Sequence, residues 1–145
     1  MILDMSNSAF SVQQSAFRPG QRFQQTRTLT LADFATFARL SGDDNPIHVD
    51  PDFAAQTRFG RPVAHGMMLY GLICGLLNQV LPDAVQLSQQ MMFPAPTFAD
   101  QPITIQAELA EYLADGEWRI LTQIFPGEYV TCRGECIVRL LEAIQ

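Results

Sequence analysis

Hydrophobic and polar positions along the chain change their period close to Pro82. Before that proline, apolar residues recur every three or four positions, which is typical of helices that pack one face on a core. After it, apolar and polar residues alternate over several segments, which is typical of strands. Residues 21–29 also partly alternate and favour an earlier strand. The pattern therefore predicts a mainly helical half followed by a sheet.

A first helix is expected over residues 31–40. Thr30 is a good N-cap for this helix, and Asp33 stands at its third position, where an acid can complete a capping box. A second, short helix is expected after Asp50, which can cap it. Pro51 then takes the first turn of that helix, where its missing amide hydrogen costs nothing.

Residues 42–49, between these helices, are expected to form a loop, because Pro46 has no amide hydrogen to give to a helix or a ladder. The second helix is expected to end near Gly60. Residues 65–80 are apolar almost all round, and Pro82 ends this segment. A helix of that kind is expected to be buried on nearly every side.

Long strands joined by short turns are expected in the second half of the chain. Asp115 with Gly116, and Pro126 with Gly127, are pairs of the kind that connect hairpins. Such an order predicts an antiparallel meander that curls around the apolar helix, because that helix has to be buried. The predicted strands cover residues 85–92, 103–113, 118–125 and 129–140.

These elements predict an α+β fold in which a curved antiparallel sheet wraps around one long central helix. With 145 residues, the chain suits a single domain, which we expect over residues 16–145. Residues 1–15 are polar and mixed, and we expect a loose arm or a peripheral strand there. The open edges of such a sheet invite pairing, so a homodimer is expected.

A formal net charge of −6 argues against a nucleic-acid partner, for which a basic stripe is expected. No apolar run reaches the roughly 18 residues of a membrane helix, and the first residues lack the basic start of a signal peptide. The cysteines have no metal-ligand spacing and are expected to be small buried residues in a reducing compartment. We therefore expect a cytoplasmic protein that binds no metal and no other cofactor.

The stretch of residues 41–50 carries an acid and an imidazole, Asp43 and His48, five positions apart. On a non-helical segment both side chains can point at one spot, and Asn45 can brace the turn through its side chain. The alternative is that each is an ordinary solvated or capping residue, which is the common role of a single Asp or His in a loop.

A second feature lies at the start of the apolar helix, where His65 precedes Gly66. Amides in the first turn of a helix lack partners and carry the positive end of its dipole, so they can receive a carbonyl oxygen that gains negative charge. Gly66 has no side chain, which lets a ligand approach its amide. The alternative is an ordinary helix start with a packed histidine.

Together these two segments resemble the signature of the MaoC-like family, the hydratase-2 type of enoyl-CoA hydratases. The likeness rests on an Asp-x-Asn-Pro-x-His-x-Asp run that begins at Asp43 and an Arg-Pro-x-Ala-His-Gly-Met run that begins at Arg61. The order of the flanking elements also agrees with the family's. The resemblance implies a hot-dog fold and R-specific 2-enoyl-CoA hydratase activity, the reversible syn addition of water to trans-2-enoyl thioesters that gives (R)-3-hydroxyacyl thioesters.

The resemblance also implies roles for single residues. Asp43 and His48 match the acid and the imidazole that act on the water, and Asn45 matches the residue that shapes their loop. Gly66 matches the glycine whose amide binds the thioester oxygen, with His65 beside it in support. The implied partner is an acyl thioester of CoA or of acyl carrier protein. Which of the acid and the imidazole takes the proton of the water stays open.

Three further residues are candidates for the site. The family often has a serine one to three turns into the central helix, facing the catalytic pair, and Cys74 stands in that place here. A thiol is a weaker hydrogen-bond partner than a hydroxyl, so Cys74 supports the pair less firmly or is a core residue. Arg58 and Arg61 are candidates for contacts to CoA phosphates, because the guanidinium fork suits phosphate. Ordinary surface ion pairs are the alternative for both arginines.

Two other functions are less well supported by the sequence. A hot-dog acyl-CoA thioesterase directs water at the carbonyl carbon and usually has a carboxylate on the central helix, but residues 66–80 contain no Asp or Glu. A non-catalytic acyl-thioester-binding subunit has no chemical need for Asp43 and His48. The hydratase uses both side chains, and we therefore expect a hydro-lyase that serves acyl-CoA or fatty acid metabolism.

Overall fold

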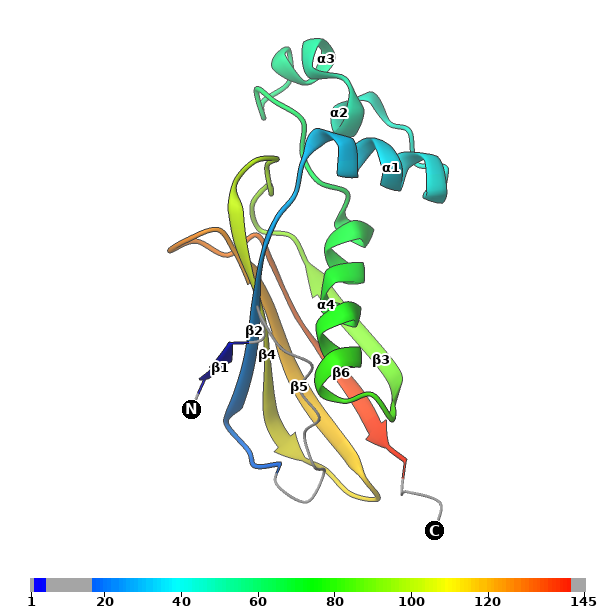
Figure 1. Ribbon diagram of the computed structural model, residues 1–145, viewed down its shortest axis with the longest axis vertical. Helices are drawn as coiled ribbons and strands as arrows, with labels where there is room; N and C mark the ends of the chain where they lie inside the picture. Colours follow the sequence, from blue (N-terminus) through cyan, green and yellow to red (C-terminus); the bar gives the residue numbers. More distant parts are fainter. Residues whose placement is uncertain (1, 5–16, 142–145) are drawn as a thin grey trace.

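Strands form where the sequence alternates, and one long helix lies along the sheet that they make (Figure 1). The computed structural model describes residues 2–4 and 17–141. Its strands are β1 (Ile2–Asp4), β2 (Gln21–Thr28), β3 (Ala84–Met92), β4 (Pro102–Tyr112), β5 (Glu117–Phe125) and β6 (Cys132–Leu140). Its helices are α1 (Leu31–Ser41), α2 (Pro46–Val49), α3 (Pro51–Ala55) and α4 (Gly66–Val80).

The strands form one sheet in the order β1-β2-β4-β5-β6-β3. β4, β5 and β6 are the expected antiparallel meander, and β2 pairs with β4. The position of β3 differs from a simple meander, because β3 pairs with β6 and not with β4. Since α4 crosses the face of the sheet between β2 and β3, the chain leaves the helix at the opposite edge (Figure 1).

The turns of the meander form where they were predicted, but the strand after the second turn begins later than expected. Asp115 and Gly116 both have positive φ values, 49° and 79°, as a two-residue hairpin turn of the primed type requires. The last strand begins at Cys132 and not at residue 129, because the turn after β5 is longer than predicted. Thr131 closes that turn by donating its amide to the carbonyl of Ile124 (2.9 Å).

The start of α1 agrees with the prediction. The side chain of Thr30 accepts from the amide of Asp33, and the Asp33 carboxylate accepts from the amide of Thr30 at 2.8 Å, which completes a capping box. The hydrogen bonds from the Thr30 amide and hydroxyl stabilise the carboxylate and lower the pKa of Asp33. The helix ends at Gly42, whose φ of 80° favours glycine.

The loop predicted for residues 42–49 is wrong in its second half, where α2 forms. Pro46 takes the first turn of α2, a position at which no amide hydrogen is needed. Asn45 caps the helix by accepting from the amide of Ile47 at 3.1 Å. The following helix α3 begins at Pro51 as predicted but ends at Ala55, earlier than expected.

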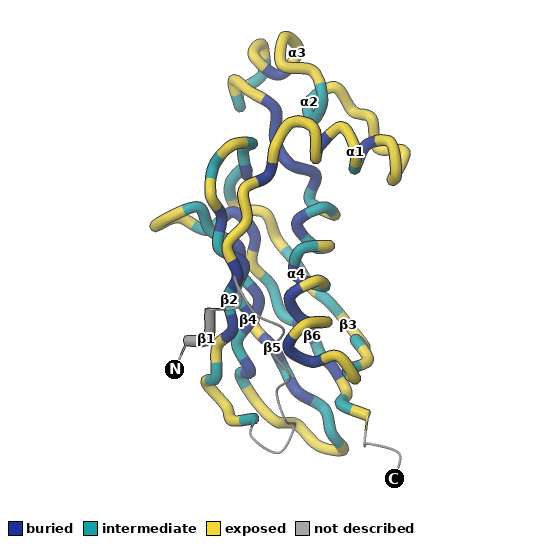
Figure 2. Tube along the Cα trace, in the orientation of Figure 1, coloured by how far each residue is buried: buried dark blue, intermediate teal, exposed yellow. Residues whose placement is uncertain are grey.

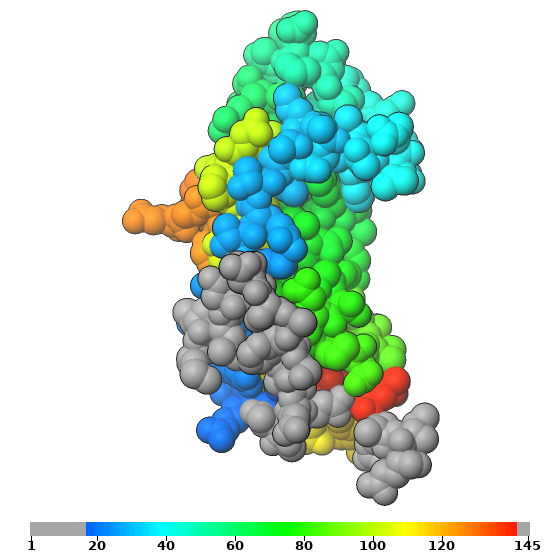
Figure 3. Space-filling model, viewed as in Figure 1, coloured from blue at the N-terminus to red at the C-terminus, as the bar shows by residue number. Residues whose placement is uncertain are grey.

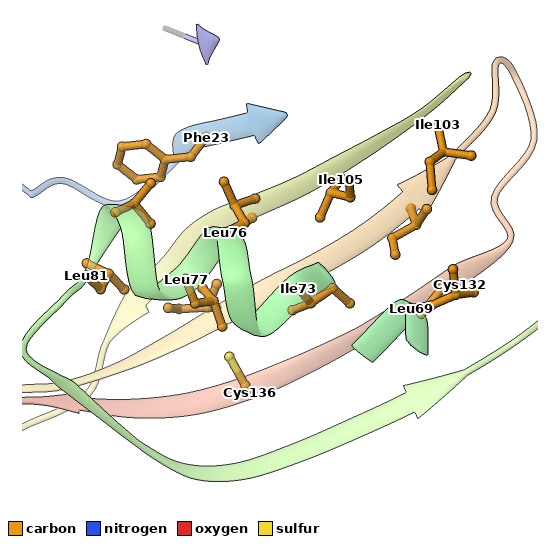
Figure 4. Packing of buried hydrophobic residues seen from close by; sticks show 14 of the residues in the cluster. Phe23, Leu69, Ile73, Leu76, Leu77, Leu81, Ile103, Ile105, Cys132 and Cys136 are labelled. Carbon is orange, nitrogen blue, oxygen red and sulfur yellow. The ribbon is translucent and has the colours of Figure 1, made fainter. Parts of the chain in front are cut away.

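The apolar side of α4 packs against the sheet and forms the centre of the hydrophobic core (Figure 4). Ile73 and Leu76 are almost completely buried there. The sheet contributes inward-facing residues from its central strands, with Ile105 on β4 and Ile120 on β5 at 0% exposure. Alternate positions along these strands face the helix, as the period of two requires.

The other side of α4 is exposed, which corrects the prediction of a helix buried on nearly every side (Figure 2). Met67, Gly71 and Gly75 follow one another at intervals of four and lie on this exposed side. The reason is that one sheet covers one side of a helix, and in the described chain no second layer covers the rest.

The predicted arm of residues 1–15 falls largely outside the described residues. Ile2–Asp4 form β1, which pairs in parallel with β2 and makes a peripheral strand at one edge of the sheet. Within residues 2–4 and 17–141, none of the helices has the length and the apolar character to cross a lipid bilayer.

The core around α4 predicts a large loss of stability for Leu76→Ala. Leu76 is 0% exposed, so truncation removes a buried isobutyl group and leaves a cavity, which costs about 2–5 kcal/mol of unfolding free energy. Urea titration followed by circular dichroism measures this loss. The matched control is Leu40→Ala, because Leu40 lies on α1 at 81% exposure and its truncation changes the free energy by less than about 0.5 kcal/mol. Equal losses in both variants would contradict the assigned core.

Candidate active site

The 43–48 segment is bound to the start of α4 by three hydrogen bonds. The amide of Val63 donates to a main-chain carbonyl of α2 (3.2 Å). The His48 imidazole donates from Nδ1 to the carbonyl of Val63 (2.7 Å). The His65 imidazole donates from Nε2 to the carbonyl of Asp43 (2.9 Å). These bonds join the two parts of the sequence motif, and α1, α2 and α3 gather at the end of the molecule where α4 begins (Figure 3).

Asp43 and His48 face each other across a short gap. Oδ2 of Asp43 lies 4.0 Å from Nε2 of His48. That distance is too long for a direct hydrogen bond and leaves room for one water molecule that donates to both atoms. The Asp43 side chain is 55% exposed and the His48 side chain 15%, so solvent reaches the pair mainly from the carboxylate side.

The hydrogen bond to Val63 decides the tautomer of neutral His48. A carbonyl oxygen only accepts, so Nδ1 carries the hydrogen in the 2.7 Å bond. Nε2 then has a free lone pair, and it is the atom that points at the Asp43 carboxylate. The geometry therefore presents a base and a carboxylate to the same small space.

Local hydrogen bonds shape the turn that carries Asp43. The hydroxyl of Ser41 donates to the carbonyl of Phe37 (2.7 Å) and accepts from the amide of Asp43 (3.2 Å). The amide of Asn45 donates to Oδ1 of Asp43 at 3.5 Å, a long bond. Asn45 itself caps α2, so its side chain shapes the segment by fixing where this helix begins. Oδ2 of Asp43 stays directed at the imidazole.

His65 is buried beneath the pair. It is 1% exposed, and its ring stacks on the ring of His48 with the centroids 3.8 Å apart and the planes 24° apart. The ring of Phe37 also packs against His65, with the two ring centroids 4.8 Å apart and the rings tilted to each other. Burial lowers the pKa of His65, although the hydrogen bond to the Asp43 carbonyl opposes this effect. The neutral form of this imidazole is therefore favoured.

Gly66 begins α4 without a side-chain cap, so its amide is available to a ligand. The place of its absent side chain is filled by Phe93, whose ring atoms lie 2.8–3.2 Å from where a Cβ would stand. The glycine thus permits a close approach of Phe93 to the helix start. Packing of Phe93 is therefore a second reason for a glycine here, besides the expected approach of a ligand.

A pocket of about 480 Å³ lies beside the start of α4. Gly66, Leu69 and Phe93 are among the residues that line it, and Arg58 is the charged side chain in its wall. The pocket and the Asp43–His48 pair share the segment of residues 63–66, but the pair itself does not line the pocket. A molecule in this pocket would reach the amide of Gly66.

Cys74 lies two turns beyond Gly66, about 12 Å along the axis at the usual helical rise. Its thiol donates to Oε1 of Gln86 on β3 at 3.8 Å, and the hydroxyl of Tyr70 donates to the same oxygen at 2.9 Å. Gln86 is its hydrogen-bond partner in the described chain. The thiol therefore braces the contact between α4 and β3, and this placement corrects the expected support of the catalytic pair.

Arg58 and Arg61 stack on aromatic rings, and neither has a carboxylate within 4.0 Å in the described part of the chain. The guanidinium of Arg58 lies 4.7 Å from the ring centroid of Phe59, and that of Arg61 lies 4.0 Å from Phe98. Within the described residues, Arg58 and Arg61 therefore do not form the ordinary surface ion pairs that were the alternative for them. Both cations keep their hydrogen-bond donors for an anion.

Asp43, His48 and His65 form a cluster whose possible metal-ligand atoms lie within 4.8 Å of one another. The two imidazoles are stacked, so an ion in the plane of one ring lies far outside the plane of the other. One nitrogen of each ring is already bound to a main-chain carbonyl. This arrangement suits acid–base chemistry better than a shared metal ion.

The contacts of two residues of the site could not be read from the sequence. Val63 acts through its carbonyl oxygen, which every residue possesses, and Phe93 reaches the site from the end of β3. The pairing of Val63 with Phe98 and the hydrogen bond from the Ala64 amide to the Thr97 carbonyl (2.8 Å) bring the segment after β3 beside the start of α4. A sequence pattern can locate an acid or an imidazole, but it cannot identify such partners.

The chain is similar to known proteins in both sequence and fold. A family model described as "MaoC like domain" matches residues 13–121. An (R)-specific enoyl-CoA hydratase from Aeromonas caviae is 39% identical over 83% of this chain and 93% of the relative. A 3-hydroxybutyryl-CoA dehydratase from Methylorubrum extorquens is 34% identical over 79% of this chain and 74% of its own length.

A solved structure gives the same result for the fold. The (R)-hydratase from A. caviae involved in PHA biosynthesis superposes with a TM-score of 0.83 at 37% identity, over 87% of this chain and 98% of that chain. This likeness confirms the hot-dog fold, with its antiparallel sheet and long central helix. The sequence motif, the sheet order and all three comparisons agree, and the chain belongs to the MaoC-like dehydratase family.

Proposed function

We propose that the protein is an R-specific 2-enoyl-CoA hydratase, a hydro-lyase that reversibly adds water to trans-2-enoyl thioesters. The observation that carries this proposal is the 4.0 Å gap between Oδ2 of Asp43 and Nε2 of His48 beside the start of α4. Hydration requires a base for water, a proton for carbon and a donor for the thioester oxygen. The relatives named hydratase and dehydratase support the same reaction.

The water molecule is activated by both members of the pair. It donates one hydrogen to Nε2 of His48 and the other to the Asp43 carboxylate, which orients it. As the water oxygen bonds to C3 of the enoyl group, Nε2 takes the first proton, and the π electrons move towards the thioester oxygen. C2 then takes that proton from Nε2, so that hydroxyl and hydrogen enter on the same face. The imidazole returns to its neutral form.

The start of α4 is the proposed site for the thioester oxygen. The amide of Gly66 lies in the first turn, where the helix dipole favours the negative charge that develops on an enolate oxygen. The neighbouring pocket of about 480 Å³ has the room for the thioester and the arm behind it. Neither step requires a metal ion or another cofactor.

Arg58 and Arg61 are the proposed contacts for the phosphate groups of the substrate carrier. Their freedom from carboxylate partners supports this role in a chain of net charge −6. A phosphopantetheine arm occurs both on CoA and on acyl carrier protein, so the shared chemistry is a phosphate at the end of a thioester arm. We expect CoA thioesters to be accepted, as by the relatives named for CoA substrates.

A thioesterase is less well supported by the structure. Along α4 no carboxylate faces the core, since its sequence contains neither Asp nor Glu. The acid of the pair lies on the 43–48 segment instead, and it shares the water site with an imidazole. A binding subunit without catalysis leaves this arrangement unexplained.

A homodimer is the proposed assembly. β3 is an edge strand with exposed apolar side chains at Val85 and Leu87, and the exposed side of α4 lies next to it (Figure 1). A second copy can cover both features, the edge strand and the exposed side of the helix. The free thiols of Cys74, Cys132 and Cys136 support a reducing compartment such as the cytoplasm.

The proposed chemistry predicts loss of hydration in Asp43→Asn and His48→Ala. Asp43→Asn removes the charge of the carboxylate that orients the water, and His48→Ala removes its base, so kcat for crotonyl-CoA is expected to fall about 10²–10⁴-fold. Absorbance of the conjugated enoyl thioester measures the reaction. Asp44→Asn is the matched control, because Asp44 is an exposed neighbour outside the pair, and wild-type rates are expected. Release of free CoA without hydration would indicate a thioesterase, and binding without turnover a binding subunit.

The proposed carrier site predicts a higher KM in Arg58→Ala and Arg61→Ala. Loss of one partly exposed cation–phosphate contact costs about 1 kcal/mol, which corresponds to a rise in KM of about fivefold with kcat little changed. Crotonyl-CoA and crotonyl-acyl carrier protein are assayed side by side to separate the two carriers. Arg22→Ala is the control, because Arg22 is already paired with Glu108 at 2.7 Å. An equal KM in all variants would exclude the two arginines.

The proposed dimer predicts a sedimenting mass of about twice 16.2 kDa. Leu87→Lys places a charge on the exposed edge strand β3, where pairing is expected, and should shift the equilibrium towards monomers. Leu40→Lys replaces an exposed leucine on α1 and should leave the mass unchanged. A monomeric wild-type protein at micromolar concentration would refute the dimer.

A further inference from the structure

His65 is a buried polar side chain that contacts both members of the proposed catalytic pair and the ring of Phe37. The chain has two histidines, and they lie face to face with their centroids 3.8 Å apart. At 1% exposure, the ring of His65 cannot contact a substrate without a rearrangement. Its influence on a reaction therefore has to pass through the residues that it touches.

The two nitrogens of His65 have unequal surroundings. Nε2 donates to the carbonyl of Asp43 at 2.9 Å, whereas Nδ1 is buried and has no hydrogen-bond partner in the described chain. Because a carbonyl only accepts, the hydrogen is on Nε2 and the lone pair is on Nδ1. A proton on Nδ1 would be buried without an acceptor, in agreement with the lowered pKa of this side chain.

Packing alone does not explain an imidazole at this position. A buried nitrogen without a partner is unfavourable, and a phenylalanine would fill a similar volume without that cost. The feature that an apolar ring lacks is the N–H donor to Asp43. The fold thus keeps a polar ring where one of its nitrogens is unsatisfied, and the other nitrogen holds the main chain of the acid.

We infer that His65 is a positioning residue for the hydration: its Nε2–H holds the main chain of Asp43, and its ring supports the face of His48. The first contact keeps the carboxylate at its distance from the imidazole. The second keeps the His48 ring in the plane in which Nδ1 reaches the carbonyl of Val63. Neither contact adds charge beside His48 while His65 is neutral.

This inference rests on the proposed hydratase function, and two substitutions separate its contacts. His65→Phe keeps an aromatic ring but loses the donor, whereas His65→Gln keeps an N–H donor but loses the ring. Loss of a buried hydrogen bond that fixes the acid is expected to lower kcat about 10-fold in His65→Phe, with KM changed less than about threefold. His65→Gln is expected to recover most of this loss, because its amide can donate to the Asp43 carbonyl.

Crotonyl-CoA hydration kinetics and thermal melting are measured together for both variants. Phe34→Leu is the stability control, because Phe34 is fully buried in α1 and outside the site, so the melting temperature falls while kcat does not. A role in packing alone predicts the reverse order, with Phe tolerated and Gln impaired.

Each result of this experiment has one meaning. The inference is supported when kcat falls more in His65→Phe than in His65→Gln without a matching order of melting temperatures. Wild-type kcat in His65→Phe, or losses of kcat that follow the melting temperature in all three variants, would overturn it. An inactive wild-type protein would instead refute the proposed function.

Discussion

The hydrogen bonds between the 43–48 segment and residues 63–65 are the constraint on which the site depends. They run in both directions: the main chain of each segment receives a bond from an imidazole of the other. Shape and chemistry are therefore coupled, because the bond that holds His48 in place also leaves its Nε2 lone pair free. A small set of contacts fixes the distance between the carboxylate of Asp43 and the imidazole of His48.

The fold supplies a rigid support for these contacts. α4 is held against the sheet by the apolar core, and its first turn stands at the end of the molecule where α1, α2 and α3 meet (Figure 1). The helix caps of Asn45 and Asp50 position the short helices that carry His48 and follow it. A polar site of this kind lies at the edge of the core, where its carboxylate keeps contact with solvent.

The side of the molecule formed by α4 and β3 carries exposed apolar residues in the described chain. Exposed apolar residues, an edge strand and two glycines on the free side of the helix lie together there. The hydrogen bonds from Tyr70 and Cys74 to Gln86 connect the same two elements from within. The pocket beside Gly66 lies at the start of α4, at one end of this surface.

The sequence by itself determined the capping box, the strands, the apolar helix and the two motifs with Asp43, His48 and Gly66. These features depend on residue type and on short spacings, which a linear pattern records. Only the tertiary structure decided the place of β3 beside β6, the contacts of Cys74, and the partners of His48 and His65. Those partners are main-chain carbonyls or residues distant in the chain, and a carbonyl acquires a role only when folding brings a donor to it.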